Sequence, residues 1–156
     1  MQMNGARFTE SHSNLSLLSA SHLAALRKRG LTDATIQEAG LWSANEQQVA
    51  EILHFDPGTE GIVIPYYHPI TGEVVMNRIR PDRLPVIGGK AAKYLSPRGA
   101  GNRLYFPPGA REWIIDPSIP IGLTEGEFKV LWTYQVGLRY IGLIGVWGWR
   151  GKKCTK

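Results

Sequence analysis

The sequence contains a single cysteine, Cys154, among 156 residues. One thiol cannot form an intramolecular disulfide, and the four histidines show no ligand spacing with it, which excludes a Cys/His zinc module. Long apolar runs are also lacking. Near the end of the chain, the longest stretch without a charged side chain, Tyr140–Trp149, has ten residues, whereas a membrane span needs about 20. No signal-peptide pattern opens the chain, so we expect a soluble, cytoplasmic protein that makes no membrane contact.

Internal repeats and low-complexity tracts are absent, and the length fits one domain or two small subdomains. The positive charge is uneven. Residues 61–111 carry eight basic and two acidic side chains, a net charge of +6, whereas residues 1–60 have a net charge of −3. A basic segment interleaved with tyrosines suits a polyanion whose bases can stack. The solvated basic face of an ordinary domain explains the charge equally well.

The first third of the sequence predicts a flexible terminus over residues 1–16, followed by three short helices. Ser19 and Thr32 are expected N-caps of the first two helices, each of which is closed by a glycine. Ser43 and Glu46 have the spacing of a capping box for the third helix.

The middle of the sequence predicts a β-hairpin, with strands over residues 62–67 and 73–80 joined by a Pro- and Gly-containing turn. Alternation along the second strand places Arg78 and Arg80 on one face and Ile79 on the other. We therefore expect the two arginines to project together.

The last third predicts a β-α-β unit, with strands over residues 121–124 and 140–144 lying parallel on either side of a helix over residues 127–136. Four apolar side chains of that helix are expected to face inward: Phe128, Leu131, Trp132 and Val136. Together with the hairpin, this pattern predicts an α+β fold.

Glu125 is the sharpest candidate for chemistry. It follows the first strand of the β-α-β unit directly, at the position where α/β folds bind ligands, and Gly126 permits a tight turn there. A carboxylate at this point can hold a hard cation or accept a proton. The alternative is a glutamate that only stabilises the positive end of the following helix.

The order of several short motifs resembles the catalytic core of bacterial and phage DNA primases. The resemblance is strongest to the Toprim-like primase domains of phage and plasmid replication proteins, long catalogued as a domain of unknown function. It covers about residues 17–152. The motifs are Lys93-Tyr94-Leu95, Leu104-Tyr105-Phe106-Pro107-Pro108-Gly109, Thr124-Glu125-Gly126-Glu127 and Gly145-Val146-Trp147-Gly148-Trp149-Arg150-Gly151.

This resemblance implies four segments: a flexible terminus (1–16), a helical segment (17–57), a basic β subdomain (58–112) and a partial Toprim-like β-α-β unit (113–156). It makes Glu125 the Toprim glutamate, an acid/base or a ligand of Mg²⁺. It implies a groove that binds single-stranded DNA, RNA or nucleotide, lined by Arg78, Arg80, Lys93, Tyr94 and Arg103. Tyr94 or Tyr105 could stack a base, although aromatic side chains near strands more often belong to the core, as we expect of Trp132.

The sequence departs from the family pattern in its acidic residues. It stops before the strand that normally supplies an Asp-x-Asp pair, and Lys129 stands where many primases carry an aspartate. Since two-metal phosphoryl transfer needs several carboxylates, we expect Mg²⁺ binding to be weak or absent and the isolated chain to be inactive. A complete protein would be a nucleotidyltransferase.

Three functions remain open on the sequence alone. The first is nucleic-acid binding within a replication primase, with a replication helicase as a possible partner. The second is a non-catalytic protein-interaction module, and the third is a nuclease or other Toprim phosphoryl-transfer module completed by a partner. An unpaired edge of the two Toprim strands is expected either to pair with a second copy or to be covered by the N-terminal helices.

Overall fold

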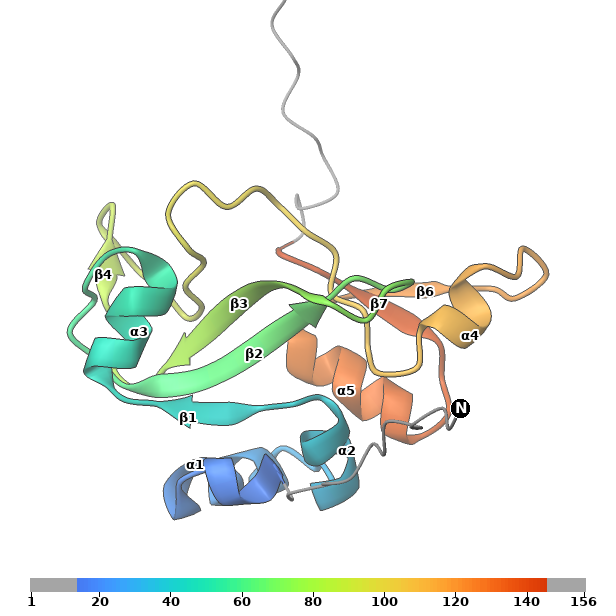
Figure 1. Cartoon of the computed structure of the whole chain (residues 1–156), viewed down its shortest axis with the longest axis horizontal. Helices are drawn as coiled ribbons and strands as arrows, with labels where there is room; N and C mark the ends of the chain where they lie inside the picture. Colours follow the sequence, from blue (N-terminus) through green and yellow to red (C-terminus); the bar gives the residue numbers. More distant parts are fainter. Residues whose placement is uncertain (1–13, 146–156) are drawn as a thin grey trace, which may run out of the picture.

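The computed structural model describes residues 14–145. Figure 1 shows a central antiparallel sheet in the order β1-β2-β3, with a separate parallel pair, β6 and β7, beside it. In chain order the elements are η1 (Asn14–Leu17), α1 (Ala20–Lys28), α2 (Asp33–Glu38), β1 (Trp42–Ala44), α3 (Glu46–Leu53), β2 (Gly61–Tyr67), β3 (Val74–Pro81), β4 (Val86–Ile87), β5 (Lys90–Ala91), α4 (Arg111–Ile114), β6 (Gly122–Glu125), α5 (Glu127–Gln135) and β7 (Tyr140–Leu143). The α+β prediction is confirmed.

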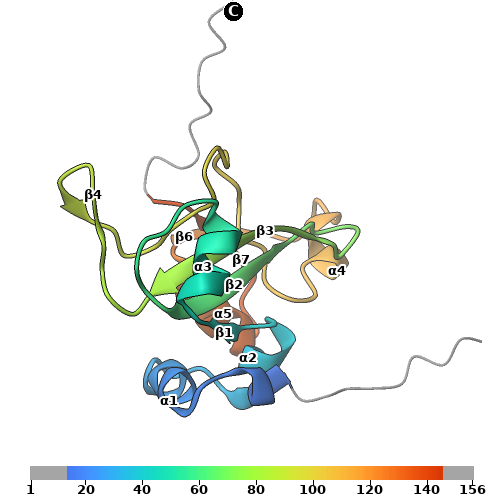
Figure 2. The same cartoon turned by 60° about the vertical axis from the view of Figure 1, so that its left-hand side comes forward.

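The central sheet is covered on both faces. Ile62, Ile64 and Met76 belong to a core that includes side chains of α1, α2 and α5. Val63 and Ile79 belong to a second core formed with α3. Figure 2 shows α3 on one side of the sheet and α1 and α2 on the other. Because successive strand residues point to opposite faces, β2 and β3 serve both cores, which explains the nearly continuous apolar sequence of β2.

Two predicted N-caps are confirmed: the side chains of Ser19 and Thr32 accept hydrogen bonds from the first turns of α1 and α2. The predicted capping box of the third helix is wrong. Asn45 and Gln48 form the box of α3, and Ser43 lies in β1, which pairs with β2. A three-residue strand is too short to show a recognisable alternation, so no pattern of residues predicted β1.

The β6-α5-β7 unit has the predicted parallel arrangement. The predicted buried face of α5 is partly wrong, because Trp132 and Val136 are 46% and 50% exposed. The buried positions are Glu127, Phe128, Val130 and Leu131. These positions lie on one side of the helix, whereas Trp132 and Val136 lie one turn apart on its flank.

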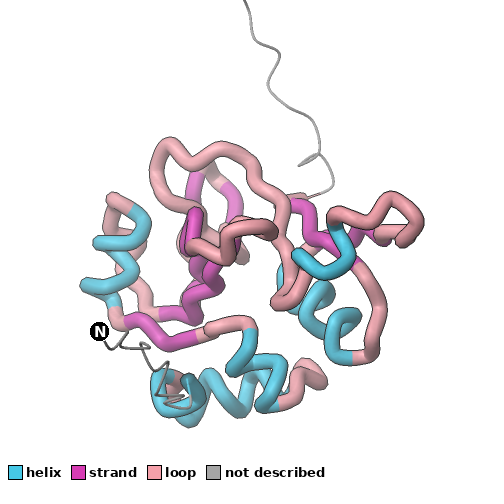
Figure 3. Tube along the Cα trace, turned by 45° about the vertical axis from the view of Figure 1, so that its right-hand side comes forward, coloured by secondary structure: helices cyan, strands magenta, loops and turns pink. Residues whose placement is uncertain are grey.

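The outer edge of β7 is covered, but not by the N-terminal helices as expected. The long segment between β5 and α4, mostly loop in Figure 3, brings Tyr105 against this edge. The backbone N–H of Tyr105 donates to the Gly142 carbonyl (2.9 Å), and the Gly142 N–H donates to the Tyr105 carbonyl (2.8 Å). The basic β subdomain thus extends the two-stranded sheet locally. Pairing with a second copy stays a prediction.

Two predicted regions lie at or beyond the limits of the described residues. Residues 14–16, expected within the flexible terminus, lie in η1, whereas residues 1–13 are outside the described part. The motif from Gly145 to Gly151 falls outside it after its first residue. Among residues 14–145, no helix has the length and apolarity needed to cross a membrane.

Candidate nucleic-acid interface

A cleft of about 330 Å³ opens at the carboxyl ends of β6 and β7. Four of the six predicted site residues line it: Arg78, Lys93, Tyr94 and Glu125. Residues 125 and 126 form the turn between β6 and α5, and Gly126 has a φ of 90°, in the region that favours glycine. The fold therefore brings together side chains that are up to 47 positions apart in the sequence.

Arg78 is part of a buried ion pair. Its Nη1 donates to Glu127 Oε1 at 2.6 Å, and the Arg78 and Glu127 side chains are only 12% and 2% exposed. The buried hydroxyl of Tyr66 donates to the same oxygen at 2.6 Å. The carboxylate of Glu127 thus neutralises Arg78 from the helix side of the cleft. The sequence did not single out Glu127, since a glutamate in the first turn of a helix is ordinarily solvated.

The surroundings of this ion pair are strongly desolvated. Burial, reinforced by the Glu127 carboxylate, raises the pKa of both Tyr66 and Tyr105 well above the ordinary tyrosine value. Burial alone would lower the pKa of Arg78, but the attraction of Glu127 outweighs it and the pKa is raised. Within residues 14–145, three buried polar atoms around the ion pair have no hydrogen-bond partner: Arg78 Nε, Glu127 Oε2 and the Tyr105 hydroxyl oxygen.

Tyr94 is the centre of a cationic cluster. The guanidinium carbons of Arg78 and Arg80 lie 5.0 and 5.1 Å from its ring centroid, so the prediction that these arginines project together is confirmed. Arg80 Nη1 also donates to the Lys93 carbonyl at 2.7 Å, which fixes the segment that carries Lys93. Cations over a ring face are attracted by its quadrupole. Arg80 is half-buried and Lys93 is exposed, which leaves their charge available to a ligand.

Arg29 extends this cluster and was missed by the sequence analysis. Its guanidinium carbon lies 5.2 Å from the ring centroid of Phe128, and Phe128 lies 6.3 Å from Tyr94 between centroids. Burial raises the pKa of Tyr94, and Arg80, Arg29 and Arg78 partly counteract this. We call Arg29, Phe128, Tyr94, Arg80 and Lys93 the basic strip. A basic residue next to a helix-ending glycine was the only available signal for Arg29.

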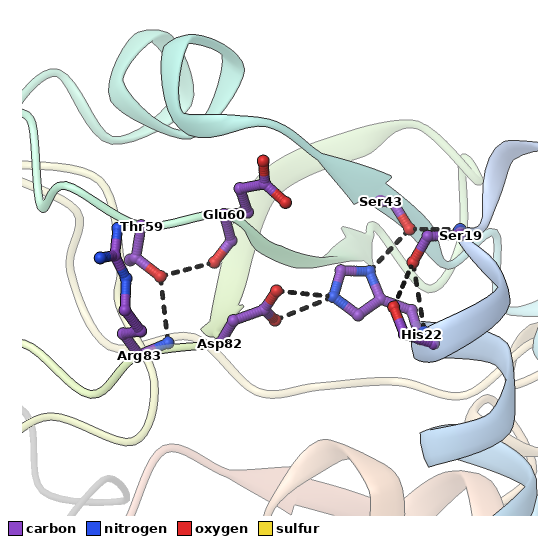
Figure 4. A network of polar contacts seen from close by, with 8 residues as sticks. Ser19, His22, Ser43, Thr59, Glu60, Asp82 and Arg83 are labelled. Atoms are coloured by element: carbon purple, nitrogen blue, oxygen red, sulfur yellow. Dashed lines mark hydrogen bonds and ion pairs between the residues drawn. The ribbon is translucent and has the colours of Figure 1, made fainter.

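Hydrogen bonds at both ends of α1 fix the position of this helix and of Arg29, which follows its last residue. Figure 4 shows His22 between Ser43 and Asp82. Its Nδ1 lies 2.7 Å from Ser43 Oγ, and its Nε2 lies 2.8 Å from one carboxylate oxygen of Asp82. At the other end, the Gln135 amide of α5 donates to the Gly30 carbonyl at 2.6 Å. These bonds hold α1 against both the central sheet and α5.

Arg103 does not share the cleft. It is exposed and lines a separate pocket with the hairpin residues Tyr67, His68 and Val75. Tyr105, the alternative stacking candidate, is 1% exposed and packs edge-on against Tyr66 at 5.1 Å, so it belongs to the core. Of the two tyrosines, only Tyr94 can contact a ligand without rearrangement.

The residues present do not fit a Mg²⁺ site. Within residues 14–145, no three His, Cys, Asp or Glu side chains gather in a way that could hold a metal ion. Glu125 is exposed, and the other carboxylate lining the cleft, Glu127, is occupied by Arg78 and Tyr66. Lys93 and Arg78 add positive charge to the same cleft. Hard divalent cations require several oxygen ligands, whereas this arrangement favours an anion.

Comparison with known proteins identifies similar folds. A family model described as a domain of unknown function (DUF3854) matches residues 111–156. No curated protein matches the chain. Several solved structures are similar to this chain. The DnaG catalytic core is 21% identical, with a TM-score of 0.57, and the match covers 85% of this chain and 50% of that chain.

The second structure contains the zinc-binding and RNA polymerase domains of the Aquifex aeolicus primase (21% identity, TM-score 0.56, 81% of this chain and 37% of that chain). The third is the DnaG primase catalytic domain bound to ssDNA (20% identity, TM-score 0.55, 85% and 51%). The chain thus spans about half the length of the catalytic cores that it matches. The predicted resemblance to primase catalytic cores is confirmed, and the described part of the chain has a primase-like fold.

Proposed function

We propose that this chain is a nucleic-acid-binding, primase-like domain of a phage or plasmid replication protein that acts in the cytoplasm. The observation that carries the proposal is the basic strip beside the cleft. In it, Arg29 lies over the Phe128 ring and Arg80 lies over the Tyr94 ring. The third cation, Lys93, lines the cleft together with Tyr94. The strip offers charge to phosphates and a half-buried ring, that of Tyr94, to a base. The similar primase catalytic domain bound to ssDNA supports single-stranded DNA as the ligand.

The individual residues would act differently from one another. Arg80 and Lys93 contact phosphates, because neither is held by a carboxylate among the described residues. Arg78 positions Tyr94, because its own charge is already neutralised by Glu127. The acid/base role of Glu125 and the nucleic-acid role of Arg103 stay predictions from the resemblance. Because Arg78 and Lys93 give the cleft lining the chemistry of an anion site, the proposed function is binding.

The test is fluorescence anisotropy with a labelled oligo-dT strand at about 50 and 200 mM salt. For a single strand, log K falls with log salt at a slope of about −0.7 per phosphate contact, so three contacts predict about a 20-fold loss over this range. The double variant Arg80→Glu/Lys93→Glu is expected to abolish that salt-dependent binding. Arg78 is not replaced, because its loss would leave Glu127 buried without its cation.

A matched control is Arg111→Glu/Arg139→Glu, which makes the same charge change at exposed positions near the opposite end of β7. This control should retain most of the affinity. Absence of binding by the wild type at 50 mM salt would overturn the proposal and favour the protein-interaction module. Mg²⁺-dependent cleavage of the strand that is lost in Glu125→Gln would instead establish the nuclease.

A further inference from the structure

A second cleft, of about 430 Å³, lies along the flank of α5. It is lined by Arg29, Thr124, Phe128, Lys129, Trp132 and Thr133. Arg29 and Phe128 also belong to the basic strip, and the Phe128 ring lies 6.3 Å from that of Tyr94. The second cleft therefore continues the strip away from the first cleft and across the start of α5.

The lining of this cleft has the chemistry of an anion site with an aromatic wall. Among the described residues that line it are two cations, Arg29 and Lys129, and no carboxylate. Its largest side chain, Trp132, is 46% exposed, although a tryptophan at this spacing was expected in the core. An indole ring beside cations provides a stacking surface and charge for the phosphate attached to the stacked base. An apolar protein segment would leave both cations uncompensated.

The two walls of the cleft, α5 and the turn that follows α1, are joined by hydrogen bonds. The Gln135 side chain accepts from the Thr32 N–H at 3.1 Å and donates to the Gly30 carbonyl at 2.6 Å. A β-carbon at Gly30 would lie only 3.3 Å from Nε1 of Trp132, so the indole lies directly beside this turn. Because the turn that follows Arg29 is bonded to α5, little ordering is needed when a ligand enters.

We propose that the second cleft is a base-and-phosphate subsite for single-stranded nucleic acid. A strand held by phosphates at Arg80 and Lys93 continues past Phe128, places one base against Trp132 and passes a phosphate between Arg29 and Lys129. The inference rests on the proposed function and adds a binding position to it. Lys129 is central, because the aspartate expected here from the family pattern would repel the strand.

The test measures the affinity for the same labelled oligo-dT strand in two single variants, Trp132→Ala and Lys129→Gln. Loss of one base stack should weaken binding by about tenfold in Trp132→Ala without changing the salt slope. Loss of one phosphate contact should lower the slope for Lys129→Gln by about 0.7. Leu138→Ala and Lys28→Gln are the matched controls, since both residues are exposed and neither lines the cleft.

A second measurement does not depend on the folding of a variant. Ultraviolet crosslinking of the wild type to a strand containing 5-iodouracil should label the tryptic peptide from Val130 to Arg139, which carries Trp132. The subsite is refuted if neither cleft variant changes the affinity and this peptide is unlabelled. The proposed function still stands in that case if the wild type binds and Arg80→Glu/Lys93→Glu abolishes binding. No binding by the wild type refutes both.

Discussion

Removal of the Glu127 carboxylate is expected to destabilise the fold more than removal of any surface charge. In Glu127→Ala, Arg78 would keep its charge in a position where the side chain is 12% exposed. Breaking a buried ion pair by deleting one partner costs about 3–5 kcal/mol. Tyr66, which is 1% exposed, would also lose the acceptor of its hydroxyl. We therefore expect a loss at the upper part of that range.

The complementary expectation concerns the double replacement Arg78→Met/Glu127→Met. In the native pair, Arg78 Nε and Glu127 Oε2 are buried without a partner in the described part of the chain, and each unsatisfied polar atom is unfavourable. Replacing both side chains with apolar ones removes the charges and these two atoms together. The double variant should therefore be more stable than Glu127→Met, which like Glu127→Ala leaves the Arg78 charge unpaired, with a coupling energy of about 0.5–3 kcal/mol between the two sites.

Urea unfolding monitored by circular dichroism gives the free energies for the wild type, Glu127→Met, Arg78→Met and the double variant. Glu125→Met is the control, because Glu125 is exposed and two residues away. The reasoning is refuted if Glu127→Met costs less than about 1 kcal/mol, or if the effects of the two single variants simply add.

Two further expectations concern stability. Because burial raises the pKa of Tyr66 and Tyr105 above the unfolded value, stability is full below about pH 10 and is lost as the pH rises further. Tyrosinate absorbance should therefore show these two groups ionising only together with unfolding, and early ionisation would contradict their burial. Gly61→Ala should cost about 1–3 kcal/mol, because its β-carbon would lie 2.5 Å from the Arg80 carbonyl oxygen. Gly101→Ala should have the melting temperature of the wild type, because no described atom lies within 4 Å of a β-carbon at that position. Equal melting temperatures of Gly61→Ala and Gly101→Ala would refute the predicted crowding at Gly61.

The helix starts, the faces of the strands and the order of the last three elements are determined by residues close to each of them in the sequence. Side-chain oxygens at Ser19 and Thr32 start α1 and α2 because the hydrogen bonds that cap a helix span only three residues. The alternation that places Arg78 and Arg80 on one face follows directly from strand geometry. The order of strand, helix and strand after residue 121 likewise gives the parallel pair.

The tertiary structure decided which of these residues share a site and what each can do there. Arg78 and Glu127 are 49 residues apart, so their ion pair has no local signal in the sequence. Arg103 has the same charge and lies in the same basic segment, but it lines a different pocket. The exposure of Trp132 depends on which face of α5 meets the sheet. Long-range packing sets burial and pairing, and these determine which charges a ligand can reach.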